Sequence, residues 1–473
     1  MSQLYEKLIE YSHSDFYPFH MPGHKRNKDS ACCKEDPVSE IIPIDITEID
    51  GFDNLHDAKG IIKEAEKEAA ALYKSENTHF LINGSTCGVL ASISAVSSLG
   101  DTLIIARNCH RSVYHGALIN RLNLAYIYPK TDSEFDISGG LSVSEVMEVV
   151  SGVKKRGGTP AGVVITSPTY EGVVSKVEDI AKALHAEGIP LIVDAAHGAH
   201  FGFAPGYPDS SVKEADIVIH SLHKTLPAPT QTALIHINGE LISDNVVLQF
   251  LRIYETSSPS YVLMAGIDRC MDILKAEGKE RLEKLFFEVE KAKESLSSMK
   301  HLQICPYTEP CKMLISVKKT VLTGEELSDI LRRDYHIETE MSSDTYVLCI
   351  LSMMDTESGI ERLIKALRQI DERITGISEE NRIFSEENDA NIKLMTRMSV
   401  FEAFNSEAEE IPFEEAEGRC STEFICAYPP GIPIVVPGEI ISGEVLEFID
   451  RKRKHELNIQ GVINGRVKVV KNG

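Results

Sequence analysis

The sequence predicts an α/β fold, in which a mainly parallel sheet is flanked by helices and smaller α+β domains follow toward the C-terminus. The main observation is that short apolar runs alternate with amphipathic stretches from about residue 59 to residue 240. This alternation is typical of strands joined by helical crossovers. With 473 residues, of which 42% are hydrophobic, the chain is also long enough to bury a sizeable core.

Seven apolar runs are the expected strands, and they are apolar enough to be covered on both faces. They are His79–Ile82, Thr102–Ala106, Leu124–Tyr128, Gly162–Thr166, Pro190–Val193, Asp216–His220 and Ala233–Ile237. The amphipathic stretches Ser142–Lys155 and Val177–Glu187 are expected helices between them. Before the first strand, Lys59–Lys74 places its apolar residues on one helical face.

Changes in this pattern predict five segments. Residues 1–58 contain four prolines and little periodicity, so they are expected to form an N-terminal arm. Residues 59–265 form a large domain. Residues 266–375, with long charged helices and the weaker strand signals Met313–Val317 and Tyr346–Leu351, form a small α+β domain. Residues 376–391 are polar and acidic and are expected to be a linker, and residues 392–473 form a C-terminal domain.

Composition excludes several classes of function. The 72 acidic and 49 basic residues give a formal net charge of −23, which argues against binding to nucleic acid or to anionic lipid. No window is apolar enough for a membrane span, and the first residues do not resemble a signal peptide. The ten cysteines are scattered without a CxxC pair, so we expect neither disulfides nor a thiolate zinc site. A cytoplasmic protein is therefore expected.

Two candidate ligand-binding positions follow early strands, where an open α/β sheet binds its ligands. In Asn83–Gly88, small residues and the hydroxyls of Ser85 and Thr86 at a helix start are suited to cradle a phosphate. An ordinary helix cap by Ser or Thr is the alternative. His110 follows the strand Thr102–Ala106 and could stack on a flat ligand, although a surface histidine near a helix start is the plainer interpretation.

Two further positions follow later strands. Asp194 ends an apolar strand, where a carboxylate is costly unless it has a partner. His197 and His200 lie one helical turn apart, but no third ligand is evident, so no metal is expected. Lys224 precedes Pro227 and Pro229, and these should keep it on a constrained loop, where a partly desolvated lysine favours imine chemistry. A solvated lysine is the alternative.

Taken together, the four positions match the parts of one cofactor. Pyridoxal 5′-phosphate (PLP) has a phosphate, a flat ring, a ring nitrogen that needs an anionic partner and an aldehyde that reacts with a lysine. A phosphate cradle, a stacking histidine, a strand-end aspartate and a lysine after the next strand would provide for each of them.

The chain resembles the bacterial ornithine/lysine/arginine decarboxylase family, PLP enzymes of the aspartate-aminotransferase fold (fold type I). The motifs that carry the resemblance run from residue 18 to residue 439. They are Pro18–Lys25 (PFHMPGHK), Gly84–Thr86, Asp194–Gly198 (DAAHG), Ser221–Leu226 (SLHKTL), Thr256–Tyr261, Tyr428–Pro433 (YPPGIP) and Pro437–Glu439. Longer members carry a wing domain ahead of the first motif. This sequence leaves no room for one, as in the arginine decarboxylases of some Gram-positive bacteria.

The resemblance implies a role for each candidate residue. Lys224 would bind the cofactor aldehyde, Asp194 would pair with the ring nitrogen and His110 would stack on the ring within the PLP-binding domain of residues 59–265. Phosphate contacts would come from Ser85, Thr86, Ser221 and His223, with Thr256 and Ser257 reaching the neighbouring subunit's phosphate. His197 would lie near the ring oxygen, and His223 is a candidate for returning a proton to the substrate's Cα. Tyr428 and Glu439 would approach the distal cation of the substrate.

The implied reaction is the decarboxylation of a basic L-amino acid, a step of polyamine biosynthesis. Arginine, giving agmatine, fits the short form best, then lysine and then ornithine. The alternatives are an aminotransferase, aldolase or lyase on the same fold, or a catalytically silent PLP-binding regulator. The resemblance also implies a homodimer with active sites at the interface and without the larger rings of the long forms.

Overall fold

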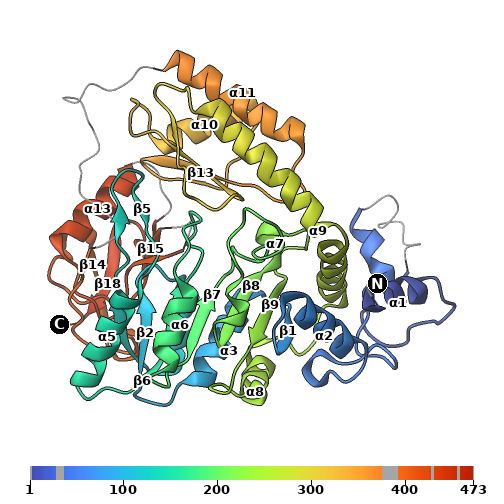
Figure 1. Ribbon diagram of the computed structural model, residues 1–473. Coiled ribbons are helices and arrows are strands. Elements are labelled where there is room, and N and C mark those ends of the chain that lie inside the picture. The colour runs from blue at the N-terminus through green and yellow to red at the C-terminus, as the bar shows by residue number, and fades with distance from the viewer. Residues whose placement is uncertain (1–2, 28–36, 375–391, 428–430, 455–458, 472–473) are drawn as a thin grey trace.

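A computed structural model describes residues 3–27, 37–374, 392–427, 431–454 and 459–471 (Figure 1). Its centre is a seven-stranded sheet of order β1-β9-β8-β7-β6-β2-β3, in which only β9 runs against the others. The strands are β1 (Asn77–Leu81), β2 (Thr102–Ala106), β3 (Asn123–Ile127), β6 (Pro160–Thr166), β7 (Leu191–Asp194), β8 (Ile217–Ser221) and β9 (Ala233–Ile237). The expected α/β class and all seven strands are confirmed, with each end within two residues of the expected position.

Helices cover both faces of this sheet. The crossovers from β1 to β2 and from β2 to β3 contain α3 (Gly84–Val96) and α4 (Arg111–Ile119), which pack on each other and, through α3, on α8 (Asp244–Tyr254). The chain then returns across the sheet through α5 (Val143–Lys155) and α6 (Val177–His185), which also pack together. Crossovers between parallel strands are right-handed. The chain moves along the sheet in one direction through α3 and α4 and in the opposite direction through α5 and α6, so these two helix pairs lie on opposite faces of the sheet.

The sheet lies in the main hydrophobic core. Every residue of β8 and β9 is buried, as expected for strands covered on both sides. The side chains of Leu103, Ile104 and Ile105 in β2 are 0% exposed. Each such aliphatic side chain contributes about 1.5–3 kcal/mol when it is removed from water, so this core fixes the strand ends that carry the candidate site.

Two smaller units flank the large sheet. One is a four-stranded antiparallel sheet of β10 (Gln303–Ile304), β11 (Lys312–Ser316), β13 (Tyr346–Ile350) and β12 (Met341–Ser342), with α10 (Gly324–Tyr335) and α11 (Glu357–Arg373). It lies at the top of Figure 1, next to α7 (Leu222–Thr225). The C-terminal segment, on the left of the view, has its own apolar core. Its elements are α12 (Val400–Phe404), β14 (Ala408–Pro412), β15 (Ile425–Ala427), β16 (Pro433–Val435), α13 (Gly443–Lys454), β17 (Ile459–Gln460) and β18 (Arg466–Val470).

The N-terminal arm is more regular than the sequence suggested. It contains α1 (Gln3–Ser12) and the short 3-10 helices Pro37–Ile44 and Leu55–Asp57. Leu4 and Leu8 of α1 lie four residues apart, so they share one helical face, and both are 0% exposed in the main core. Two leucines one helical turn apart are too short a pattern to predict a helix in a segment that also contains four prolines.

One helix crosses an expected domain boundary, and the expected loop around Lys224 needs correction. The long helix α9 (Tyr261–Leu296) is continuous through the boundary expected at residue 265, so it joins the large domain to the small one. Lys224 lies in the one-turn helix α7 rather than on a loop, because Pro227 and Pro229 come after the turn instead of within it. The N–H of Leu226 closes that turn on the carbonyl of Leu222 at 2.9 Å. Over the described residues, no helix combines the length and apolarity needed to cross a membrane.

Candidate active site

The four positions singled out in the sequence meet at one edge of the large sheet. Strands β1, β2, β7 and β8 all run in the same direction, so their carboxyl ends lie together. Gly84 follows β1, His110 follows β2, Asp194 ends β7 and Lys224 follows β8. The fold therefore brings together groups that are 140 residues apart in the chain.

The N-terminus of α3 has the properties expected of an anion site. The residue before the helix is Asn83, whose side chain does not cap the helix but donates instead to the carbonyl of Tyr254 at 3.0 Å. The hydroxyls of Ser85 and Ser221 are hydrogen-bonded to each other, which places β8 against this helix start, and Thr86 is exposed beside them. Ser and Thr thus do not act as ordinary caps here, and the first backbone N–H groups of the helix face the site edge.

Asp194 is a buried carboxylate at the end of β7, only 5% exposed. The N–H of Ala196 donates to its Oδ1 at 3.2 Å. Burial raises the pKa of Asp194, while the charge of Lys224 opposes that rise. A carboxylate held in this way is stabilised most by a cationic partner, such as a protonated ring nitrogen.

Lys224 lies beside a histidine from the preceding strand end. Its Nζ is 3.0 Å from Nε2 of His197, which is itself 4% exposed. Burial lowers the pKa of Lys224, although the charges of Asp194 and Glu340 oppose this. The lowered pKa favours the free amine, which is the nucleophilic form of lysine.

Two more histidines from the expected set border the site. His110 caps α4 by accepting from the N–H of Ser112, and burial together with the charge of Lys224 lowers the pKa of His110 to about 4. Its ring is therefore neutral at pH 7, as suits stacking. His223 places Nδ1 3.1 Å from the carbonyl of Thr232, and burial lowers the pKa of His223 as well.

The structure adds a residue that sequence reasoning missed. Lys312, at the start of β11 in the small domain, is 0% exposed, and its Nζ lies 2.7 Å from Nδ1 of His197. It also lies 5.5 Å from the ring centre of Tyr170, which packs edge-on against His197. A lysine at a strand start usually reaches solvent, so nothing in its local sequence marks it as buried.

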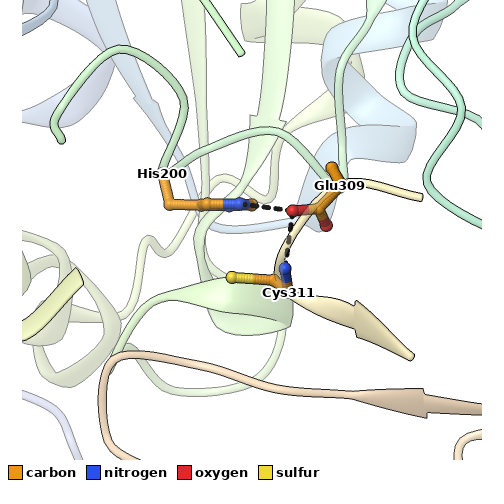
Figure 2. A group of neighbouring side chains, drawn as sticks. All are labelled: His200, Glu309 and Cys311. Carbon is orange, nitrogen blue, oxygen red and sulfur yellow. Dashed lines mark hydrogen bonds and ion pairs between the residues drawn. The ribbon is translucent and has the colours of Figure 1, made fainter. Parts of the chain in front are cut away.

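A buried cluster behind Lys312 contains three potential metal ligands, His200, Glu309 and Cys311 (Figure 2). Nε2 of His200 lies 3.0 Å from Oε2 of Glu309, and the backbone N–H of Cys311 donates to the same oxygen at 2.8 Å. Protons therefore already bridge these groups. We interpret the cluster as a hydrogen-bonded support for Glu309, which lies three residues before Lys312.

Glu439, expected to approach the substrate, is buried against an arginine. It is 1% exposed, and its Oε2 lies 3.3 Å from Nη2 of Arg107 and accepts from the N–H of Val436 at 2.8 Å. Arg107 also donates to the carbonyl of Pro433 at 2.6 Å. The pair thus joins the end of β2 to the C-terminal segment, and the expected approach of Glu439 to a substrate cation stays a prediction.

The remaining expected residues are Tyr428, Thr256 and Ser257. Tyr428 falls outside the described residues. Thr256 and Ser257 are exposed just after α8, where the carbonyl of Thr256 lies 2.8 Å from Nε2 of His56. Their hydroxyls are thus accessible at the surface of a single subunit.

The described side chains fit PLP. The uncapped start of α3 with Ser85 and Ser221 can hold the phosphate, and Asp194 can pair with the ring nitrogen. Lys224 has a depressed pKa suited to binding an aldehyde, and neutral His110 borders the same space. Each chemical feature of the cofactor therefore has a matching group at this sheet edge.

Comparisons of sequence agree with this chemistry. Residues 2–310 match a family model described as Orn/Lys/Arg decarboxylase, major domain, and residues 377–462 match the corresponding C-terminal domain. The chain is similar to an arginine decarboxylase of Bacillus anthracis, with 31% identity over 479 residues. That alignment covers 97% of this chain and 94% of the relative.

Comparisons of structure agree with the fold. A lysine decarboxylase of Francisella novicida superposes with a TM-score of 0.87 at 20% identity, covering 100% of this chain and 81% of that one. A structure of SPT with PLP superposes with a TM-score of 0.52 at 15% identity, covering 65% of this chain and 75% of that one. Both likenesses are to the fold, a mainly parallel central sheet flanked by helices.

Proposed function

The chain belongs to the Orn/Lys/Arg decarboxylase family and is a PLP-dependent amino acid decarboxylase, and from this premise we propose that it converts L-arginine to agmatine. Family membership decides for decarboxylation over the aminotransferase, lyase and silent alternatives. The observation that carries the choice of arginine is the near full-length similarity to the Bacillus anthracis arginine decarboxylase. Lysine is the second candidate and ornithine the third.

We propose that Lys224 binds the cofactor and Asp194 keeps its ring nitrogen protonated. When bound, PLP supplies an electron sink for the bond that breaks at the substrate's Cα. The carboxylate of Asp194 is buried, and its interaction with a positive ring nitrogen is therefore only weakly screened by water. The preorganised charge of Asp194 would stabilise the transition state without rearrangement.

Further roles follow from the contacts of the other expected residues. Ser85, Thr86 and Ser221 would hold the phosphate, since they surround the uncapped start of α3. His110 would cover one ring face as a neutral imidazole. His197 would donate toward the ring oxygen through Nε2, the atom that now faces Lys224.

His223 is our candidate for proton return. Its Nδ1 is within hydrogen-bonding distance of the Thr232 carbonyl, which can only accept, so Nδ1 must carry the proton. Nε2 is then free to take up a proton and to give it back to Cα. Because burial lowers the pKa of His223, the protonated ring is a stronger acid than an ordinary imidazolium, and the return is favourable.

We further propose a homodimer whose active sites include both subunits. Thr256 and Ser257 are exposed, and their hydroxyls would complete the phosphate site of the neighbouring subunit. His223 would contribute to the phosphate site of its own subunit. The arm exposes large apolar side chains in addition. Phe16, Tyr17 and Phe19 are 70%, 69% and 91% exposed, which a partner subunit would cover. The five expected segments remain our proposal for the domains, with α9 as the link at residue 265.

The substrate is tested by measuring carbon dioxide release from arginine, lysine and ornithine under identical conditions. We expect kcat/KM for arginine to exceed that for lysine by roughly tenfold or more, because a site that hydrogen-bonds a guanidinium leaves groups unpaired around an ammonium. Aspartate and glutamate should be inactive. A preference for lysine or ornithine would refute the choice of arginine while leaving the reaction class intact.

Lys224 is tested by reducing the holoenzyme with borohydride and sequencing the labelled peptide by mass spectrometry. We expect the pyridoxyl group on Lys224. Lys312, buried nearby, is the internal comparison because both amines are close to His197. A label on Lys312 or any other lysine would show the assignment to be wrong.

The shared site is tested by mixing two inactive variants, Lys224→Ala and a Thr256→Ala/Ser257→Ala double variant. In mixed dimers of a two-fold assembly, one site carries both lesions and the other carries neither, so activity should return toward about a quarter of wild type. An absence of recovery after demonstrated subunit exchange would refute sites shared between subunits.

A further inference from the structure

Three nitrogen-bearing side chains lie in a row through the candidate site. Nζ of Lys312 is 2.7 Å from Nδ1 of His197, and Nε2 of His197 is 3.0 Å from Nζ of Lys224. The imidazole therefore bridges two lysines, one from the small domain and one from the large domain. Lys312 has no part in the roles described above.

The direction of these hydrogen bonds follows from where protons can be. An ammonium group has three donors and no acceptor, so a charged Lys312 must donate to Nδ1 of His197. A neutral imidazole then carries its single proton on Nε2 and donates to Lys224. An amine that accepts this bond must have a free lone pair, so this arrangement requires Lys224 to be unprotonated.

We propose that Lys312 is a positioning residue, which fixes the tautomer of His197 and through it holds Lys224 as the free amine. The inference rests on the proposed function in taking Lys224 as the cofactor lysine. A free amine is the form that can attack the aldehyde of PLP, and it is also the form needed when the product leaves. Because Nδ1 of His197 accepts from Lys312, Nε2 stays a hydrogen-bond donor toward Lys224, both when the cofactor binds and when the product leaves.

The proton inventory of the site supports this arrangement. Burial and the charge of Lys312 hold the pKa of His197 well below its usual value, so the ring is neutral. Burial also lowers the pKa of Lys312, to about 8, against the opposing charge of Glu309. The negative charge of Glu309 favours the ammonium form of Lys312.

The surroundings keep Lys312 charged and in place. Glu309 supplies the nearby negative charge, and it is oriented by His200 and by the N–H of Cys311 (Figure 2). Gly172 leaves the space for the lysine stem, since a Cβ at that position would lie 2.6 Å from Cγ of Lys312. The charged and titratable groups that act on the two lysines are Asp194, Glu309, Cys311 and Glu340, with His110, His197 and His223 next to Lys224.

The tautomer is measured first in the full-length wild-type protein without added cofactor. Long-range ¹H–¹⁵N spectra of histidine-labelled protein would identify His197 by the signals lost in His197→Gln. We expect a proton on Nε2 and none on Nδ1 at pH 7. A proton on Nδ1, or on both nitrogens, would overturn the proposal. This readout needs no substrate, so its failure is distinct from a failure of the proposed function.

The second measurement uses Lys312→Met, which keeps the length of the side chain but removes the donor. His197 can then move its proton to Nδ1 and accept from a charged Lys224. The lost hydrogen bond from His197 favours the charged form of Lys224 and so raises its pKa. Labelling of Lys224 by an amine-reactive reagent near neutral pH should fall by up to about tenfold, as measured by peptide mass spectrometry in cofactor-free protein.

Lys318→Met is the matched control. Lys318 belongs to the same domain, and its Nζ is paired with Asp136 at 2.8 Å, away from His197. Its loss should leave Lys224 labelling unchanged. Equal labelling of Lys224 in folded Lys312→Met and in wild type would refute the role of Lys312. If Lys312→Met does not fold, the wild-type spectrum still decides the question.

Discussion

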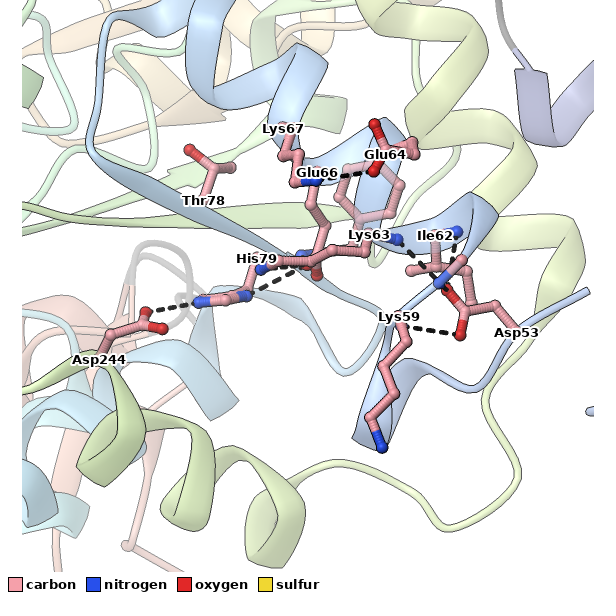
Figure 3. A network of polar contacts seen from close by, with 12 residues as sticks. Asp53, Lys59, Ile62, Lys63, Glu64, Glu66, Lys67, Thr78, His79 and Asp244 are labelled. Carbon is pink, nitrogen blue, oxygen red and sulfur yellow. Dashed lines mark hydrogen bonds and ion pairs between the residues drawn. The ribbon is translucent and has the colours of Figure 1, made fainter.

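His79 should stabilise the protein in a pH-dependent way, through two carboxylates that hold it from either side. It lies on β1 with Nε2 2.7 Å from Asp244 of α8 and Nδ1 3.3 Å from Glu66 of α2 (61–73) (Figure 3). Its side chain is 4% exposed. Burial alone would lower the pKa of His79, but the two carboxylates outweigh it and raise that pKa to about 9.

The magnitude follows from the difference between the folded and unfolded states. A rise from 6.5 to about 9, at 1.36 kcal/mol per unit, corresponds to roughly 3 kcal/mol of folding free energy. Because the folded-state pKa is the higher one, this contribution is complete below pH 6.5. It declines as the pH rises from 6.5 and is lost above about 9.

The test is urea-induced unfolding of wild type and His79→Gln from pH 6 to pH 9.5, followed by far-UV circular dichroism. We expect the variant to be less stable by roughly 3 kcal/mol at pH 6, with a difference that shrinks steadily toward pH 9. His13→Gln, at an exposed histidine of the arm, is the matched control and should show no such trend. A difference between wild type and His79→Gln that is constant over this pH range would refute the ion-pair reasoning.

Three further outcomes are expected. Asp194→Asn keeps the shape of the side chain but removes its charge, so kcat should fall by about 10² to 10³ with an unchanged circular dichroism spectrum; turnover within a few fold of wild type would contradict its role. Glu439→Ala leaves the charge of Arg107 buried and unpaired, and should cost roughly 3–5 kcal/mol in urea unfolding. If Glu439 instead bound the substrate, KM would rise while stability stayed the same. Gly172→Ala forces a side chain onto a backbone with φ +100° and against Lys312, so the free energy of unfolding should drop by roughly 1–3 kcal/mol. An unchanged free energy of unfolding would refute the inference that Lys312 leaves no room for a Cβ at residue 172.

The strands of the large domain could be predicted because their signals are local. Each apolar run has the length of one strand, and the residue after the run lies at the sheet edge whatever its neighbours are. Asp194 and Lys224 were recognisable for this reason. The helix α1 and the one-turn helix α7 were not predicted, since a few residues carry too little periodicity and nearby prolines favoured irregular structure.

The sequence by itself thus determined the α/β class, the strand ends and a set of groups that matches PLP. Only the tertiary structure placed His197 between Lys224 and Lys312, which is 115 residues further along the chain than His197. It also paired Glu439 with Arg107, 332 residues apart. The spacing of apolar residues along the sequence indicates which face of a helix or strand is buried. It does not indicate which charged side chain from a distant part of the chain will be buried against that face. A buried charge is tolerated only where folding provides a partner, and so its role is decided by packing.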